Sequence, residues 1–302
     1  EELEEMTERI ARQISEIFAL PEEQIVLEIL SRYFCDVFHE QINSLAEPDS
    51  PANLELNIKN RRVGLTFQNN RCTKFESELS LVHKAVYIDN PFIIDRLNQY
   101  NEGPTDLFLE SLLTRTSDDD IMDGIIGTVL AREKMAEIYQ ALESVVNGRI
   151  VIKNEEDYYL EKDGWSQPIS FANLSVGLKS FVILKMLIER GALEEKDVIV
   201  LDEPEVHLHP QWQVAYAELI VLMQKYFDLS VVVTTHSPYF LDAIELFSGK
   251  HGIGGRVNYY LSSIENDRVK MDCVTGDIER IYRKMASPIQ VLDTLRYELN
   301  NK

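Results

Sequence analysis

Two short apolar runs, each followed by a predicted helix, constrain the fold more than any other feature of the chain. "VIVLD" predicts a strand over 198–202 before a helix over 211–226, and "SVVVT" predicts a strand over 230–234 before a short helix over 238–246. Runs of Val and Ile that do not alternate with polar residues are typical of strands buried on both faces. Such strands alternating with helices predict an α/β fold, with helices packed on a parallel sheet.

Polar residues stand where these two strands end. Asp202 and Glu203 close the first strand, and His236 follows the second. The carboxyl ends of parallel strands meet at one edge of the sheet, and ligands of open α/β sheets bind outside that edge. We therefore expect these three side chains to belong to one ligand site.

The N-terminal third predicts helices and then antiparallel strands. Apolar residues recur at helical spacing over 1–45, with a break near Pro21, which predicts an N-terminal helical segment over 1–50. The runs "LELNI", "RVGLTF" and "CTKFESE" predict a β-meander, and "KAVYID" predicts a further strand over 84–89.

A mostly helical insertion is predicted over 91–148, including a long helix over 118–145. The core of the fold then comprises 51–90 and 149–302. It contains a hairpin in "RIVIKN" and "DYYLEKDG", and it closes with two further strands and two terminal helices; the strands are predicted over 256–262 and 268–273.

Composition excludes several classes of protein. The 302 residues are 45% hydrophobic, enough for a sizeable core, and no apolar run approaches the roughly 20 residues that span a bilayer. A formal net charge of −21 opposes non-specific binding to nucleic acid, which depends on Lys and Arg. Three scattered cysteines fit a reducing cytoplasm rather than a disulfide framework or a zinc site.

Adjacent acids at a strand end suit the hydrolysis of a nucleotide. Asp202 can hold a Mg²⁺-bound water beside phosphates, and Glu203 can orient or deprotonate the attacking water. His236 can donate a hydrogen bond to a phosphoryl oxygen. Taken singly, each also has an ordinary structural interpretation, as an acidic turn or as a histidine beside a helix N-terminus.

A third pattern, "NLSVGLKSF", precedes the predicted strand of the two acids. Ser175 is a candidate N-cap, and Gly177 allows the backbone to approach a ligand closely, so this helix start can bind an anion. A serine-capped amphipathic helix without a ligand is the alternative interpretation.

In order and spacing, the three patterns together resemble the motifs of ABC-type ATPases. "LSVGL" resembles the signature motif, "VIVLDEP" the Walker B strand with its catalytic glutamate, "EVHLHP" the D-loop and "TTHS" the switch histidine. The form "LDEPEVHLHPQWQ…TTHSPYFL" is most similar to bacterial AAA-family ATPases of the OLD-like group, relatives of the SMC and RecF proteins. The resemblance covers 170–245. The signature departs from Leu-Ser-Gly-Gly-Gln at Val176 and Leu178.

The resemblance implies a P-loop NTPase-type fold that binds ATP and Mg²⁺. Asp202 would then support Mg²⁺, Glu203 would activate water, and His236 would stabilise the γ-phosphate. The signature residues would contact the nucleotide of a second copy, so that two copies dimerise around ATP; these residues are Leu174, Ser175 and Gly177.

The resemblance also suggests residues outside these strand ends. The D-loop would carry His207 and His209. Gln68 is the candidate for the glutamine that senses Mg²⁺ in the family, and Gln99 is its rival.

No phosphate-binding loop of the form GxxxxGK[ST] (Walker A) occurs in the sequence. In the family this loop precedes all the motifs described above, so we expect it upstream of Glu1. A degenerate protein that cannot bind ATP by itself is the alternative.

By analogy with the family, ATP hydrolysis would open and close a dimer that regulates a separate effector. The expected effector is a nuclease or toxin of a bacterial defence system, with nucleic acid reached only through the complex. The alternatives are a DNA-repair ATPase of the SMC or RecF type, a transporter subunit and a non-catalytic nucleotide-gated scaffold. "DEPEVHLHP" differs from the "DEPTSALD" form usual in transporters, and no sustained heptads predict a long coiled coil.

Overall fold

The computed structural model describes residues 21–58, 60–79, 83–97, 104–115, 129–153, 157–266 and 268–300. The chain forms two compact units. Unit 1 comprises Glu1–Val82 and Asn101–Phe108, and unit 2 comprises His83–Tyr100 and Leu109–Lys302. The division predicted from the sequence, with a helical segment, a core and an insertion, places its boundaries elsewhere and stays a prediction.

Unit 1 is a small antiparallel sheet packed on one helix. The strands β1 (Ala52–Ile58), β2 (Arg61–Gln68) and β3 (Arg71–Ser77) pair in that order, as the predicted meander requires. The helix α2 (Glu22–Val37) covers the apolar face, where Phe34 lies against the buried ring of Phe67. The helix predicted before Pro21 lies outside the described residues.

Unit 2 is built on a parallel sheet, as predicted. Its strands are β4 (Ala85–Ile88), β8 (Val198–Leu201) and β9 (Ser230–Val233), with β8 in the middle. Pairing is in register along all three strands, so that Ile88, Leu201 and Val233 lie side by side at the carboxyl edge. The predicted α/β fold class is confirmed.

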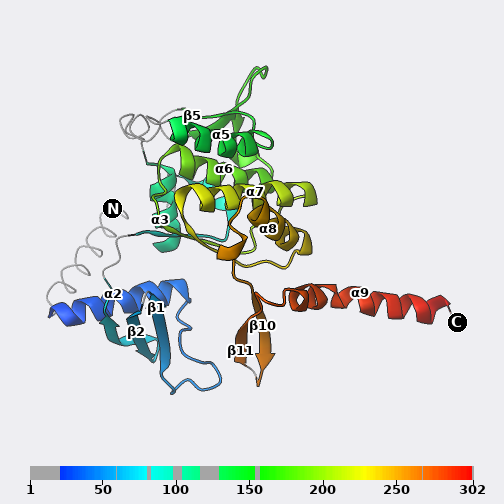
Figure 1. The fold of residues 1–302 in the computed structure, drawn as a ribbon. Helices are drawn as coiled ribbons and strands as arrows, with labels where there is room; N and C mark the ends of the chain where they lie inside the picture. Colours follow the sequence, from blue (N-terminus) through cyan, green and yellow to red (C-terminus); the bar gives the residue numbers. More distant parts are fainter. Residues whose placement is uncertain are drawn as a thin grey trace. The chain divides into compact units, whose positions relative to one another are not determined.

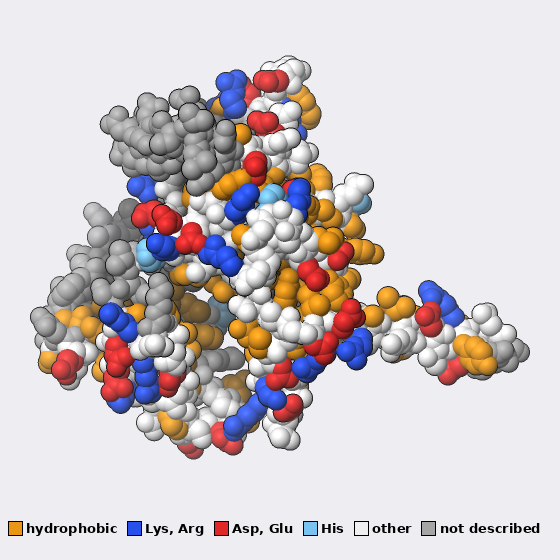
Figure 2. Space-filling model, viewed as in Figure 1, with side chains coloured by type: hydrophobic (Ala, Val, Ile, Leu, Met, Phe, Trp, Pro, Cys, Tyr) orange, Lys and Arg blue, Asp and Glu red, His pale blue; other side chains and the backbone are white. Residues whose placement is uncertain are grey.

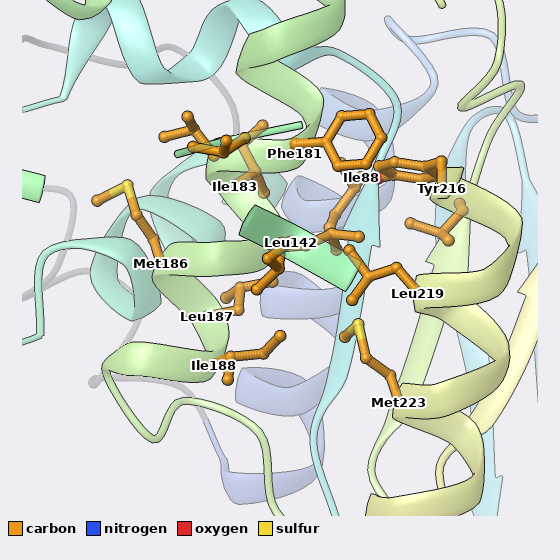
Figure 3. Close-up of a cluster of buried hydrophobic side chains, with 14 of the residues drawn as sticks. Ile88, Leu142, Phe181, Ile183, Met186, Leu187, Ile188, Tyr216, Leu219 and Met223 are labelled. Carbon is orange, nitrogen blue, oxygen red and sulfur yellow. The ribbon is translucent and has the colours of Figure 1, made fainter. Parts of the chain in front are cut away.

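Helices α6 (Val176–Glu189) and α7 (Pro210–Phe227) pack against this sheet, and α6 is buried almost all round. Figure 3 shows Phe181 of α6 beside Ile88 from β4 and Tyr216 from α7. The Phe181 and Tyr216 rings form an edge-to-face pair with centroids 5.0 Å apart. This continuous core holds the strand ends in place, because close-packed interiors tolerate little displacement.

The other elements of unit 2 lie around this core (Figure 1). The segments β5 (Arg149–Lys153), β6 (Asp157–Glu161) and β7 (Ile169–Ser170) form an antiparallel sheet that includes the predicted hairpin. The helical elements are η1 (Pro91–Arg96), α3 (Pro104–Leu113), α5 (Val129–Glu143), η2 (Phe171–Asn173), α8 (Pro238–Lys250) and η3 (Gly254–Arg256). The first residues of α3 are assigned to unit 1 and the rest to unit 2. Of the helix predicted over 118–145, the described part is α5.

The C-terminal elements differ from the prediction. β10 (Tyr260–Glu265) begins later than expected and pairs with β11 (Arg268–Cys273) as a separate hairpin. The two predicted terminal helices are one helix, α9 (Glu279–Asn300), with Pro288 inside it. Hydrophobic side chains are exposed along α9 (Figure 2). None of the described helices is both long and apolar enough to cross a membrane.

Candidate active site

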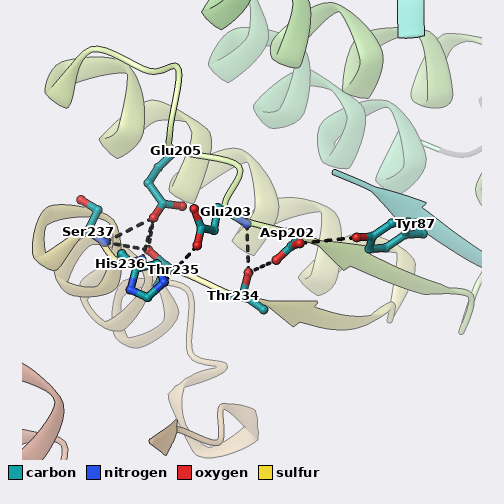
Figure 4. A network of polar contacts seen from close by, with 8 residues as sticks. All are labelled: Tyr87, Asp202, Glu203, Glu205, Thr234, Thr235, His236 and Ser237. Atoms are coloured by element: carbon teal, nitrogen blue, oxygen red, sulfur yellow. Dashed lines mark hydrogen bonds and ion pairs between the residues drawn. The ribbon is translucent and has the colours of Figure 1, made fainter. Parts of the chain in front are cut away.

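The strand ends of β8 and β9 bring the two predicted catalytic side chains together. Glu203 follows β8 and His236 follows β9, and the pairing of Leu201 with Val233 makes these ends neighbours. Glu203 Oε1 lies 2.9 Å from His236 Nε2, while the two side chains are 40% and 85% exposed (Figure 4). A carboxylate and an imidazole in contact and open to solvent can act on a ligand placed outside the sheet edge.

Asp202 is held from both neighbouring strands. The Thr234 hydroxyl, at the end of β9, donates to Asp202 Oδ1, and the Tyr87 hydroxyl of β4 lies 3.4 Å from Asp202 Oδ2 (Figure 4). Burial raises the pKa of Tyr87 to about 12, and the nearby Asp89 and Asp202 carboxylates add to the shift. Tyr87 therefore remains a hydrogen-bond donor at neutral pH and keeps the Asp202 carboxylate oriented.

The backbone of Glu203 adopts a left-handed conformation. Its φ is 45°, a value that residues other than glycine seldom adopt, and its N–H donates to Thr234 Oγ1 over 2.9 Å. Strained backbone of this kind persists only where its surroundings hold it, and it gathers at functional sites. Thr234 thus positions both predicted acids, one through its carboxylate and one through its main chain.

The signature residues form the start of α6. Ser175 is the N-cap, and its Oγ accepts from the Leu178 N–H over 3.4 Å, while Leu174 is buried beneath it. A Cβ on Gly177 would come within 2.9 Å of the His207 carbonyl oxygen. The structure therefore gives Gly177 a packing role against the D-loop segment. Ser175 is exposed, as a contact with a second copy requires.

The two D-loop histidines have different positions. His209 caps α7, where its Nδ1 accepts from the Gln211 N–H over 3.4 Å. His207 is exposed, and its ring lies edge-on to Phe92 with centroids 6.1 Å apart. His207 also lines the pocket beside the acids, so it is the one that faces a possible ligand space.

The candidate glutamines stay predictions. Gln68 ends β2 in unit 1, whereas Asp202 belongs to unit 2. Gln99 lies outside the described residues. The structure thus groups Asp202, Glu203 and His236 and leaves a role for either glutamine as a prediction.

Sequence reasoning missed Tyr87, Thr234 and Glu205. Tyr87 and Thr234 hold Asp202, and the buried Glu205 accepts hydrogen bonds from the segment that carries His236. Thr234 and Glu205 stand inside the motifs "TTHS" and "EVHLHP", so their position in those motifs was the available signal.

A pocket of about 230 Å³ opens beside Asp202 and Glu203, and Asp89, His207 and Tyr216 contribute to its wall. Its carboxylates would repel a phosphate group directly, so a Mg²⁺ ion between them and the phosphates fits this donor set. Within the described ranges, no three His, Cys, Asp or Glu side chains gather as a set of metal ligands. Mg²⁺ usually retains several waters and binds phosphate oxygens, so a single supporting carboxylate such as Asp202 is compatible with it.

The parallel sheet with its two acids and histidine defines the class of protein: an ABC/AAA-type ATPase domain. Residues 39–242 match the model of a family described as "AAA domain, putative AbiEii toxin, Type IV TA system". Because this match spans more than half of the chain, the chain belongs to that family of AAA domains. The class predicted from the motifs is confirmed.

Several solved structures of SMC ATPases are similar to the chain. The SMC head domain from Thermotoga maritima is 15% identical with a TM-score of 0.40, over 74% of this chain and 73% of that one. An SMC head bound to the C-winged helix domain of ScpA is 13% identical with a TM-score of 0.42, over 74% and 73%. A structure from work on ATP-driven dimerization and DNA-stimulated activation of SMC ATPases is 15% identical, with a TM-score of 0.36, over 56% and 96%.

Proposed function

We propose that the protein hydrolyses ATP at the carboxyl ends of β8 and β9. The observation that carries this proposal is the 2.9 Å contact between Glu203 Oε1 and His236 Nε2 at that edge. An acid next to a hydrogen-bond donor, both open to solvent, suits the attack of water on a phosphate group.

Each residue then has a defined task. Glu203 orients the attacking water and accepts its proton, and His236 donates a hydrogen bond to the transferring phosphoryl group. Asp202, held by Thr234 and Tyr87, supports a water bound to Mg²⁺. The metal would supply charge neutralisation for the phosphates when it is bound.

We further propose that two copies enclose the nucleotide between them. Ser175 is exposed at the N-terminus of α6, where free N–H groups and the helix dipole favour an anion. In this arrangement Ser175 of one copy contacts the ATP that the strand ends of the other copy hold. Opening and closing of such a dimer would then regulate a separate effector, a nuclease or toxin of a bacterial defence system, and the family description of AAA domains of this kind, which names a toxin–antitoxin system, supports this proposal.

The test is Glu203→Gln in the full-length protein. This change removes the carboxylate that accepts the proton but keeps the shape of the side chain. We expect kcat for ATP to fall by about 10²- to 10⁴-fold, the range for loss of a general base, with ATP affinity retained. Sedimentation should show an ATP-bound dimer that persists, because the nucleotide is no longer consumed.

Glu195→Gln is the matched control. Glu195 is an exposed carboxylate near the opposite, amino end of β8, and the same change there should leave turnover unaltered. Equal turnover in wild type and Glu203→Gln would contradict the proposal. A wild-type protein that binds ATP without turning it over would favour the scaffold function instead.

A further inference from the structure

Glu205 is a buried acid two residues beyond Glu203, and its side chain is only 3% exposed. Its Oε1 accepts hydrogen bonds from the His236 N–H at 2.9 Å, from the Ser237 N–H at 3.2 Å and from the Thr235 hydroxyl. Three donors of the continuous segment 235–237 thus converge on a single oxygen of the β8 loop, the segment 202–209 between β8 and α7 (Figure 4).

These contacts determine where His236 stands. The His236 side chain is 85% exposed, so packing contributes little to its position. Its main-chain N–H is bound by Glu205, and the residues on both sides of it are bound by the same carboxylate. Hydrogen bonds from N–H groups to a carboxylate are among the stronger kinds, which makes Glu205 an effective anchor for this turn.

A second set of hydrogen bonds joins the β8 loop to the segment 235–237. The Ser237 hydroxyl donates to Gln213 Oε1 over 2.6 Å, and Gln213 Nε2 donates to the Glu205 carbonyl oxygen over 3.4 Å. The contacts close a ring through Glu205, Ser237 and Gln213. A displacement of the β8 loop is therefore passed to the segment that carries His236.

Burial of this carboxylate is not fully compensated. Glu205 Oε2 is among the buried side-chain oxygens of the described residues that have no hydrogen-bond partner. Such groups are costly and uncommon in native proteins. The other oxygen, Oε1, accepts all three hydrogen bonds from the segment 235–237, so the contacts of this carboxylate are directed at the segment that carries His236.

We propose that Glu205 is a positioning residue for ATP hydrolysis, which couples the β8 loop to His236 and holds that histidine against Glu203. This inference rests on the function proposed above. Glu205 touches neither substrate nor metal in this account, and it acts through the backbone of 235–237.

The experiment measures ATP turnover of full-length Glu205→Ala and Glu205→Gln. Loss of an electrostatic donor typically lowers kcat by about 10²- to 10³-fold. Glu205→Ala displaces the donor His236 without removing it, so kcat should fall by about 10- to 100-fold. The KM for ATP should change by less than about threefold. Glu205→Gln keeps an acceptor oxygen for the same N–H groups and should recover kcat to within about fivefold of wild type.

A double-mutant cycle separates positioning from a merely structural role. In a His236→Ala background, Glu205→Ala should lower kcat by less than about threefold, because the residue it positions is gone. The same loss in both backgrounds, or an unchanged kcat in Glu205→Ala, would overturn the inference.

Asp197→Ala is the control for stability. Asp197 is 1% exposed and accepts from the N–H groups of Lys84 and Glu194, but it stands before β8, at the amino edge of the sheet. This variant should lose comparable thermal stability while kcat stays within about twofold of wild type. An equal loss of kcat in Asp197→Ala would also overturn the inference.

Thr235→Val keeps the test decisive if Glu205→Ala does not fold. It removes one of the three donors to Glu205. The typical free energy of one hydrogen bond predicts that kcat falls by about 3- to 10-fold. In the His236→Ala background the same change should have no effect on kcat. Failure of Glu203→Gln to reduce turnover would remove the proposed function itself. Loss of activity in Glu203→Gln and His236→Ala but not in Glu205→Ala or Thr235→Val would refute this inference alone.

Discussion

At the scale of single residues, the site depends on hydroxyl groups that orient carboxylates. Thr234 contacts the side chain of Asp202 and the main chain of Glu203, and Tyr87 reaches Asp202 from the other side. Groups that hold a metal-supporting carboxylate usually matter nearly as much as the carboxylate itself. The precision of this site therefore comes from β4 and β9 together.

Tyr87→Phe tests the contribution from β4. Removing the hydroxyl frees one side of Asp202, so the Mg²⁺ concentration for half-maximal ATP turnover should rise by up to about tenfold. This is the lower end of the usual effect of such a change, because the contact between Tyr87 and Asp202 is long at 3.4 Å. Tyr260→Phe, the same change on β10, should leave the Mg²⁺ requirement as it is. An unaltered requirement in Tyr87→Phe would show that Asp202 needs no support from β4.

The raised pKa of Tyr87 makes its contribution to the stability of the fold depend on pH. An ordinary tyrosine ionises near pH 10, whereas Tyr87 ionises at about 12 in the folded protein. Between these values the unfolded chain loses the proton more readily than the folded one. The contribution of Tyr87 to stability is thus complete below pH 10 and is lost as the pH rises toward 12.

The sequence predicts the acids and the histidine but not their supports. Val-rich runs that end in Asp202-Glu203 or precede His236 are local patterns, and parallel pairing then brings the strand ends together. Tyr87 and Glu205 act through partners 115 and 31 residues away, so even where a motif contains the residue, as for Glu205, no local pattern gives its partner. The prediction of Gln68 rests only on its place at the end of a strand, and it stays a prediction.

At the scale of elements, α6 and the segment before α7 form one packed pair. Gly177 lies where α6 approaches His207 most closely, and an added Cβ would stand 2.9 Å from a carbonyl oxygen and 3.2 Å from Trp212. Glycine is therefore required here by close approach of backbone to backbone. The interpretation of Gly177 as a nucleotide contact and this packing role are compatible.

Gly177→Ala should destabilise the fold by about 1–3 kcal/mol, the usual cost of overpacking, because a main-chain carbonyl cannot move aside cheaply. Thermal or urea unfolding measures this change. Gly249→Ala in α8 is the matched control, because open space surrounds that position and alanine favours a helix by about 0.5–1 kcal/mol. Equal stability of Gly177→Ala and wild type would show that α6 can shift away from the loop.

The two terminal helices predicted from the sequence are the single helix α9, which continues through Pro288. Pro288 has no N–H to donate to the carbonyl of Lys284, four residues earlier. The Ser287 hydroxyl donates to that carbonyl oxygen over 2.8 Å instead. The side chain thus replaces the missing bond, and the helix continues through the proline.

At the scale of the whole molecule, the proposed ATP site belongs to an acidic chain, and carboxylates line the pocket beside it. The net charge of −21 and the carboxylates beside the pocket mean that phosphates need Mg²⁺ and donors from elsewhere to bind. A partner copy that presents the N-terminus of α6 would supply part of that positive potential. Dimerisation and nucleotide binding are then expected to depend on each other.

In the proposed function, Glu203 and His236 act as one catalytic pair on ATP. The most direct measurement is kcat of full-length Glu203→Gln, His236→Ala and the double variant. Groups that work as a unit are not additive, so the double variant should lose no more than about the larger single loss, on the order of 10²- to 10⁴-fold. Single losses that multiply in the double variant, or a His236→Ala protein with wild-type kcat, would contradict the account.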